Sequence, residues 1–335
     1  MKHFLSILFV LFFAHVCIAQ DVHLSQYYHS PLLTNPALTG KHRQTIRLVM
    51  NQRQQWKSVT VPFTTFALSA ETNRISTKKN ISAGFSITND KAGDSKLNTF
   101  QVNLSSAFVF SVNPDSSAMV RLGAQTGFTQ KKIDFSDLRF DEQYNGFAFD
   151  PSLPNFEDQS NLKTSFANLN LGLDFDKEID SRRGYGMGIG VFNLLNPAYN
   201  FLGDTQSKLE NRLSTQAHYH QDIAKDWDII LSAQGMWQGS FREQIIGAMF
   251  KKIWRDDNIL NRAGYIGAFM RVKDSGSLLL AMDYDDWKFG VSYDFNYSPL
   301  NVASRYRGGL ELSVIYLIDI FNETIKPHRA CPDFI

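Results

Sequence analysis

Two histidines, at positions 218 and 220, are the first candidates for a chemical role, because their side chains could bind a metal ion. Side chains two positions apart on a strand share one face, so His218 and His220 could together ligate a metal ion. No third His or Cys has a suitable local spacing, and we favour a pair without metal. The sequence also lacks Gly-x-Ser-x-Gly, His-Glu-x-x-His and a phosphate-cradling glycine loop. We therefore expect no catalytic residues, no cofactor and no enzyme activity.

An acidic stretch between positions 132 and 162 is the second candidate site. Its carboxylates could supply oxygen ligands for Ca²⁺, but their order does not match an EF-hand, and we favour a solvated acidic loop. The carboxylates are those of Asp134, Asp137, Asp141, Glu142, Asp150, Glu157 and Asp158.

The charge balance excludes one large class of function. The chain has 34 Lys and Arg against 33 Asp and Glu, whereas a nucleic-acid binder needs a basic excess to meet phosphate. We expect no nucleic-acid partner.

The first 19 residues form a secretory signal. Lys2 precedes an apolar run at positions 4–14, and the small residues Cys17 and Ala19, two positions apart, precede Gln20, so cleavage is expected after Ala19. The alternative is an uncleaved anchor, which we disfavour because the apolar run is short for a membrane span. After cleavage Cys331 is the only cysteine, so no disulfide can form within the chain.

Strict alternation of apolar and polar residues dominates the rest of the sequence and predicts strands. For example, Phe289, Val291 and Tyr293 alternate with Gly290 and Ser292. We count about 14 segments with no linker or repeat, and an even number is typical of outer-membrane barrels. The segments are 43–50, 62–72, 80–89, 97–111, 117–131, 163–175, 184–194, 209–220, 226–237, 241–252, 261–271, 276–284, 286–297 and 305–317.

Paired aromatic residues indicate that the barrel crosses a membrane rather than folding as a soluble exported β-protein. Three pairs lie ten positions apart, which on a tilted strand projects to roughly 25 Å, the height of the apolar band between two aromatic girdles. We expect these six side chains at the membrane interfaces, namely Trp227, Trp237, Trp287, Tyr297, Tyr306 and Tyr316. The predicted fold is all-β, a single transmembrane antiparallel β-barrel of the bacterial outer membrane.

The opposite faces of the strands are polar and suit a hydrated lumen. Charged residues of this parity predict either a lumenal charge network or simple hydration, and we weigh the two equally. They are Arg121, Asp294, Arg305, Arg307 and Glu311. With the amino terminus in the periplasm, the longest connection, at positions 132–162, faces outward, as barrel loops do.

A single helical turn is expected before the first strand. Asn35 can cap it, Pro36 suits the first helical position, and Gly40 can end it.

The residues around this turn resemble a known family. The series Gln26-Tyr27, Pro31 and Asn35-Pro36-Ala37 is similar to the mature amino terminus of the PorP/SprF family of type IX secretion system membrane proteins, although Val22 and Leu24 replace the usual Pro and Phe. Asn51-Gln52-Arg53-Gln54-Gln55-Trp56, Asn89-Asp90-Lys91-Ala92-Gly93, the last two strands and the ending Cys331-Pro332-Asp333-Phe334 extend the resemblance along the chain. It implies an outer-membrane protein that supports export or cell-surface attachment of large secreted proteins, often gliding adhesins.

These inferences predict a domain plan and two functional hypotheses. We expect a signal peptide at 1–19, a periplasmic segment at 20–42, the barrel at 43–317 and a periplasmic tail at 318–335. The first hypothesis is a secretion component whose partners are secreted cargo or an adhesin, type IX components on the periplasmic side, and outer-membrane lipid. The second is a passive or lipid-type channel.

The two ends of the mature chain are a candidate plug or docking surface, although simple covering of the strand ends is slightly favoured. The residues concerned are Gln26, Tyr27, Pro31, Asn35, Pro36, Ala37, Cys331, Pro332 and Phe334.

Overall fold

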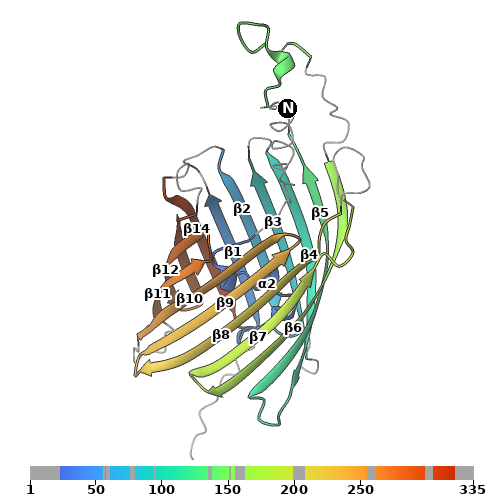
Figure 1. The fold of residues 1–335 in the computed structure, drawn as a ribbon. Helices are drawn as coiled ribbons and strands as arrows, with labels where there is room; N and C mark the ends of the chain where they lie inside the picture. The colour runs from blue at the N-terminus through green and yellow to red at the C-terminus, as the bar shows by residue number, and fades with distance from the viewer. Residues whose placement is uncertain are drawn as a thin grey trace, which may run out of the picture.

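Fourteen antiparallel strands close into one barrel in the computed structural model (Figure 1). Each strand pairs with its neighbours in sequence, and β1 closes the ring against β14. The structure describes residues 23–55, 57, 61–75, 80–93, 96–134, 138–150, 152–154, 163–198, 208–254, 262–298 and 305–320. The strands are β1 (Ile46–Gln55), β2 (Phe63–Thr72), β3 (Ile81–Ala92), β4 (Leu97–Ser111), β5 (Ala118–Lys132), β6 (Lys163–Asp180), β7 (Arg183–Phe192), β8 (Arg212–Ala224), β9 (Trp227–Gln238), β10 (Phe241–Trp254), β11 (Arg262–Arg271), β12 (Ser275–Tyr284), β13 (Trp287–Asn296) and β14 (Arg307–Ile318).

The alternation predicted from sequence sorts the side chains between the two faces of the wall. On β13 the apolar residues Phe289 and Val291 are exposed on the outside, whereas Ser292 and Asp294 are buried inside. An apolar outer face suits lipid, and a closed barrel satisfies every strand hydrogen bond there. The prediction of a 14-stranded all-β barrel is confirmed. Among the described residues, no helix has the length and apolar character to cross a bilayer.

Strands β1 and β6 each extend five residues beyond their predicted ends. The first was expected to end at position 50, but β1 pairs with both neighbours through Gln55, which brings Asn51 and Arg53 onto its inner face. Similarly β6 continues beyond position 175 to Asp180. In both cases the added stretch is mostly polar, so apolar–polar alternation does not mark it, and pairing with the neighbouring strands extends the ladder.

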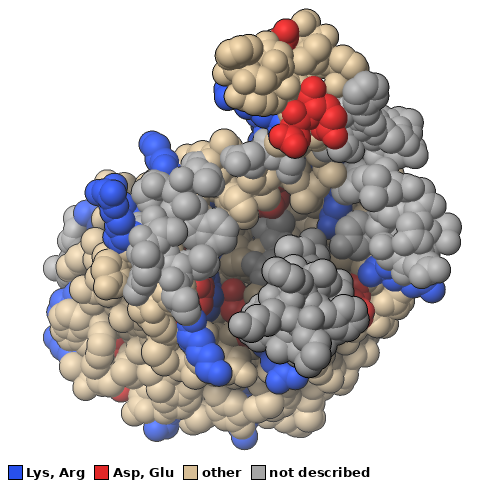
Figure 2. Space-filling view, turned by 45° about the horizontal axis from the view of Figure 1, so that its top comes forward, with Lys and Arg blue, Asp and Glu red and all other residues tan. Residues whose placement is uncertain are grey.

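The barrel has two distinct ends. We call the end where β1 begins and β14 ends the proximal end, and the opposite end the distal end. The distal end carries the long β5–β6 connection with its 3₁₀ turn η3 (Asp141–Gln143), which projects beyond the rim. In the view toward the distal end, Lys and Arg side chains stand around the rim and acidic side chains gather on the projecting connection (Figure 2).

Residues 23–42, which we call the luminal segment, lie inside the barrel. The segment folds into two short 3₁₀ turns, η1 (Tyr27–His29) and η2 (Pro36–Leu38), around the helical turn α2 (Pro31–Thr34). The predicted turn is confirmed, since the Asn35 side chain caps η2 by accepting a hydrogen bond from the Ala37 backbone N–H at 2.9 Å. The domain plan expected from sequence assigns residues 20–42 to the periplasm, whereas residues 23–42 lie across the lumen in the structure.

Candidate functional site

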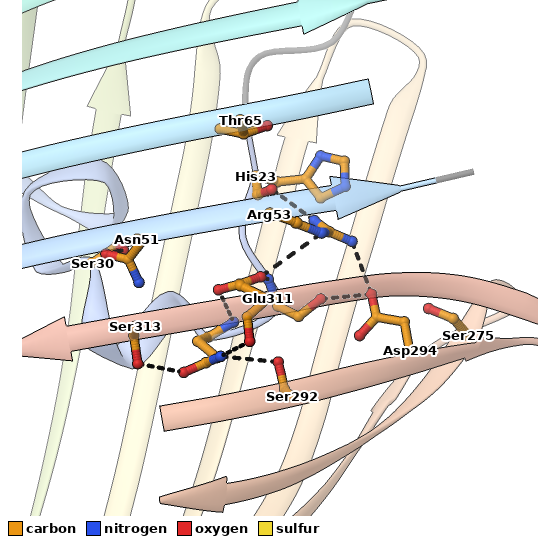
Figure 3. Close-up of polar contacts among 12 residues, drawn as sticks. His23, Ser30, Asn51, Arg53, Thr65, Ser275, Ser292, Asp294, Glu311 and Ser313 are labelled. Carbon is orange, nitrogen blue, oxygen red and sulfur yellow. Dashed lines mark hydrogen bonds and ion pairs between the residues drawn. The ribbon is translucent and has the colours of Figure 1, made fainter. Parts of the chain in front are cut away.

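The distal part of the lumen holds a buried ion-pair cluster centred on Arg53 (Figure 3). Its guanidinium contacts the Asp294 carboxylate on β13 at 2.9 Å and the Glu311 carboxylate on β14 at 3.8 Å. It also donates a hydrogen bond of 2.7 Å to the backbone carbonyl of His23. Arg53 and Glu311 are almost fully buried, so each charge depends on the others for its stability. The cluster thereby joins three wall strands to the start of the luminal segment.

Glu311 binds the backbone of the luminal segment directly. Its two carboxylate oxygens accept hydrogen bonds from the backbone N–H groups of Ser25 and Gln26, at 2.8 and 3.0 Å. The Gln26 side chain donates to Ser292 at 3.0 Å and accepts from Ser313 at 2.7 Å. Hydrogen bonds to a buried carboxylate are stronger than neutral ones, so the wall holds this stretch by its main chain.

Arg271 extends the cluster around the rim of the lumen. Its guanidinium contacts the Glu243 carboxylate at 3.1 Å and the Asp274 carboxylate at 3.0 Å. It donates to the Ser25 hydroxyl at 3.0 Å, and that hydroxyl donates to Asp294 at 2.8 Å. The Ser25 hydroxyl therefore links β11 and β13.

The capped turn of the luminal segment packs on a patch of glycines. A Cβ atom at Gly123 on β5 would lie 2.2 Å from the Ala37 nitrogen, and one at Gly172 on β6 would lie 2.0 Å from the Asn35 side-chain oxygen. Gly188 and Gly190 on β7 approach Asn35 in the same way. Only residues without a side chain allow this close approach of backbone to wall.

Wall side chains also bind the main chain of this turn. Gln125 and Arg212 donate to the carbonyls of Leu32 and Leu33, each at 3.2 Å, and Asn35 donates to the Leu173 carbonyl at 3.0 Å.

A second charge cluster lies toward the proximal end. The Lys41 ammonium contacts the Asp174 carboxylate at 3.0 Å and the Asp176 carboxylate at 2.6 Å. Arg121 on β5 pairs with the same two carboxylates. Nearby, Glu71 accepts from the Gly40 backbone N–H at 2.7 Å and from Arg47 at 2.8 Å. Both ends of the luminal segment are thus fixed by carboxylates of the wall.

The two histidines singled out in the sequence face carboxylates across β7. His218 lies 3.5 Å from Asp176 and His220 lies 3.3 Å from Glu178. The intervening residues on β7 are Gly184 and Gly186, whose missing side chains leave the space in which these groups meet. Within the described part of the chain, no group of three or more His, Cys, Asp or Glu side chains could hold a metal ion.

Aromatic packing supplements the polar contacts. Tyr27 is buried against Ile245, Phe269 and Leu279 on the inner face of β10–β12, and the Tyr28 ring stacks on Phe269 with 5.1 Å between ring centroids. The segment leaves a cavity of about 210 Å³ on its proximal side, which is lined by Tyr27, Tyr28, Pro31, Thr34, Lys41, His218 and Ser232, among others.

Histidines of the luminal segment are held neutral by burial. Burial lowers the pKa of His29 well below its usual value, and the charges of Lys288 and Arg47 lower it further. Its ring nitrogen lies within hydrogen-bond distance of Gln26 and Ser313, at 3.0 and 2.8 Å. Burial likewise lowers the pKa of His42 to about 4, with a smaller contribution from Arg47. These two histidines therefore pack in their neutral form.

The structure separates the charged residues that sequence parity grouped together. Asp294 and Glu311 lie in the distal cluster, and Arg121 lies in the proximal one. Arg305 and Arg307 are exposed at the start of β14, and neither forms an ion pair with another described residue. Parity identifies the face of a strand but not the height or the neighbours of a side chain.

Sequence reasoning missed several residues that carry the site. Arg53 and Asp176 lie beyond the predicted strand ends, and Asp174 lies within its predicted strand but was not among the candidate lumenal charges. Arg53 keeps the inward parity of Val49 on β1, and Asp174 and Asp176 keep that of Asn170 on β6. This continued parity was the signal that could have found them. The glycines of β7 were assigned to a hydrated face, whereas they contact Asn35 and adjoining side chains.

The predicted interface aromatics lie at the two ends of the strands. Trp227, Trp287 and Tyr316 lie at the proximal end, where the rings of Trp287 and Tyr316 stack at 4.3 Å. Trp237, Tyr297 and Tyr306 lie at the distal end. Cys331, Pro332 and Phe334 lie outside the described residues, as do residues 1–22 and Asp137, Glu157 and Asp158 of the acidic connection.

A family comparison gives this arrangement its biological setting. The model of the type IX secretion system membrane protein PorP/SprF matches residues 16–316. The chain belongs to this family. No curated protein matches this PorP/SprF protein.

Solved structures resemble the PorP/SprF chain in outline. The monoaromatic hydrocarbon channel CymD aligns with a TM-score of 0.49 at 10% identity, over 87% of this chain and 93% of its own. The P. putida toluene transporter TodX aligns with a TM-score of 0.48 at 8% identity, over 88% and 95%. A Pseudomonas aeruginosa FadL homologue aligns with a TM-score of 0.39 at 10% identity, over 86% and 94%.

Proposed function

We propose that this protein is an integral outer-membrane component of type IX secretion that supports export or cell-surface attachment of large secreted proteins, such as gliding adhesins. Its barrel acts as a closed structural unit rather than as a passive or lipid-type channel. The proximal end faces the periplasm and engages secretion components there, and the distal end engages secreted cargo or an adhesin outside. Membership of the PorP/SprF family supports the assignment to secretion.

The observation that carries the closed-barrel proposal is the luminal segment. It is bound to β1, β13 and β14 at one end and to β2 and β6 at the other. The Lys41 ammonium is paired with two wall carboxylates, and Glu311 and Glu71 accept hydrogen bonds from backbone N–H groups of the segment. Hydrogen bonds to an ionised group are about twice as strong as neutral ones. A segment held in this way does not leave the lumen spontaneously to admit solutes.

Planar-bilayer recordings distinguish the closed barrel from the channel. We expect the purified native protein to show no steady conductance. The double variant Arg53→Met with Lys41→Met removes one cation from each cluster and should produce intermittent channel openings. Arg307→Met, at an exposed arginine, is the matched control and should behave as native. A steady ohmic conductance of the native protein would establish the channel alternative.

Secretion itself is tested in the source bacterium. Deletion of the gene should remove at least one large secreted protein from the cell surface, as measured by surface proteomics, and the native gene should restore it. An unchanged set of surface proteins after deletion would refute the proposed role.

A further inference from the structure

The outer wall of the barrel is hollowed by a groove over the paired strands β8 and β9. Its floor consists of outward-facing residues with small side chains, in which Thr215 lies opposite Gly235 and Ala217 lies opposite Ala233. The groove has a volume of about 600 Å³. Its floor residues lie in the distal half of β8 and β9, so the groove opens on the distal half of the membrane-facing wall.

Larger side chains form the two sides of this groove. Met187 and Ile189 of β7 pair with the small residues of β8 and stand on one side. Gln244 and Ile246 of β10 pair with the small residues of β9 and stand on the other side, close to Trp237. Because the sides belong to the strands that flank β8 and β9, the groove runs along the strand direction, from the distal end toward the middle of the wall.

The chemistry of the groove changes with depth. Arg242 lies opposite Trp237 at the distal end; it is exposed and forms no ion pair with another described residue. Gln244 and Thr215 flank Gly235 two positions deeper, and two positions on a tilted strand descend roughly 5 Å. Below them the floor and both sides are apolar. A cation is thus followed by hydrogen-bonding groups and then by an apolar channel, which is the order of phosphate, linkage and acyl chain in a phosphorylated lipid.

We propose that this groove binds one acyl chain of lipid A, the phosphorylated glycolipid of the outer leaflet, with a lipid A phosphate on Arg242. The inference rests on the proposed function for the orientation that turns the distal end outward. An arginine guanidinium binds phosphate through charge-assisted hydrogen bonds. The Gln244 amide both donates and accepts, so it suits the amide and hydroxyl groups of the hydroxyacyl chains of lipid A, whereas the esters of a glycerophospholipid only accept.

The small floor residues favour a bound chain over a loosely packed lipid shell. Inside a bilayer an acyl chain gains little by leaving other chains, so close van der Waals packing decides whether it stays at one place. A groove with raised sides contacts a chain on three faces, whereas a convex wall contacts it on one. A second copy of the protein is a poorer occupant, since a two-fold contact across the groove would bring two copies of Arg242 together.

Native mass spectrometry of the purified full-length protein tests the site. The protein in detergent micelles is titrated with monophosphoryl lipid A and, separately, with phosphatidylglycerol, an anionic glycerophospholipid. Ala233→Phe fills the floor of the groove, and Arg242→Gln removes the charge. The matched controls are Ala124→Phe, at an outward-facing alanine of β5, and Arg307→Gln, at an exposed arginine of the distal end. All four positions are outside the luminal ion-pair clusters, so the variants should fold as the native protein does.

We expect the native protein to retain lipid A in preference to phosphatidylglycerol. Arg242→Gln should weaken the retention of lipid A by about tenfold, the loss of one charge-assisted contact. Ala233→Phe should weaken it at least as much, because its ring occupies the place of the chain. Ala124→Phe and Arg307→Gln should retain lipid A as the native protein does.

Three results would overturn the proposal. Equal retention of lipid A by Ala233→Phe and Ala124→Phe would indicate an unselective lipid shell. A preference of the native protein for phosphatidylglycerol would exclude lipid A as the occupant. A native dimer that Ala233→Phe dissociates would assign the groove to a second copy of the chain. Lipid binding by the purified protein does not involve export, so any of these results leaves the proposed role in secretion to the deletion experiment.

Discussion

At Glu311 a single carboxylate joins the barrel wall to the luminal segment. Glu311→Gln keeps the shape but removes the charge that faces Arg53 and the N–H groups of Ser25 and Gln26. We expect it to lower the free energy of unfolding by about 3 kcal/mol. Urea unfolding in detergent micelles, followed by tryptophan fluorescence, measures the change. Glu210→Gln, at an exposed carboxylate, is the control. An equal effect of the two substitutions would contradict the claim that Glu311 stabilises the barrel by joining its wall to the luminal segment.

Gly123 tests the contact between the turn and the wall. Gly123→Ala places a methyl group 2.2 Å from the Ala37 backbone nitrogen, and the turn must move to accommodate it. We expect the free energy of unfolding to fall by about 1–3 kcal/mol, as it does when a well-packed interior is overpacked. Gly276→Ala meets its nearest atom at 3.9 Å and should leave the urea midpoint unchanged. An unchanged urea midpoint for Gly123→Ala would contradict the close packing of the Asn35–Ala37 turn on the wall.

His42 predicts a dependence of the luminal segment on pH. Its pKa is lowered by burial from 6.5 to about 4, so the unfolded chain binds the proton more tightly than the folded one. The contribution of neutral His42 to the free energy of unfolding is fully present above pH 6.5 and is lost as the pH falls toward 4. The neighbouring Arg47 disfavours the imidazolium as well. Protease sensitivity of the segment should rise over this range, and His42→Gln should flatten the rise.

At the scale of elements, the hairpin turns connect strands through residues with unusual backbone angles. The two-residue turn between β12 and β13 holds Asp285 at a φ of 54°, where a β-branched side chain is strained. We expect Asp285→Val to lower the free energy of unfolding by about 1–2 kcal/mol. Asp286→Val, in the same turn, serves as the control and should have a smaller effect. Equal losses from the two variants would indicate that the backbone angle is not the cause.

Neighbouring strands cooperate to shape the lumen. The long strand β6 carries Asp174 and Asp176 inward, and the glycine-rich strand β7 lets side chains of β6 and β8 meet over it. Replacing a glycine of β7 would therefore disturb contacts between two other strands. The alternating glycines of β7 therefore leave room for side chains of neighbouring elements to pack against this strand.

For the whole molecule, an even number of strands brings the start of β1 and the end of β14 to the same end of the barrel. The tail that follows Ile320 should therefore be periplasmic. In the native protein Cys331 is the only mature thiol. We expect a membrane-impermeant maleimide to label it only after the outer membrane is permeabilised. Strong labelling in intact cells would reverse the proposed topology.

The sequence alone determined the fold class and the face on which each strand residue lies. Alternation with a period of two is a local property, so Phe289 and Ser292 could be assigned to opposite faces without a structure. The capped turn at Asn35 was equally local, because Asn, Pro and Gly favour those backbone positions by themselves. These inferences needed no knowledge of distant neighbours.

Only the tertiary structure decided where the luminal segment lies and which charges meet. Ser25 and Glu311 are 286 positions apart, and Arg53 and Asp294 are 241 apart. Such pairs depend on closure of the ring and on the height of each residue along its strand, which a period of two does not encode. For the same reason Arg307 shares the parity of Glu311 but remains exposed, whereas Arg53 lies at the centre of the distal cluster. Burial of a charge is settled by its neighbours in space, because only a nearby opposite charge compensates the loss of water.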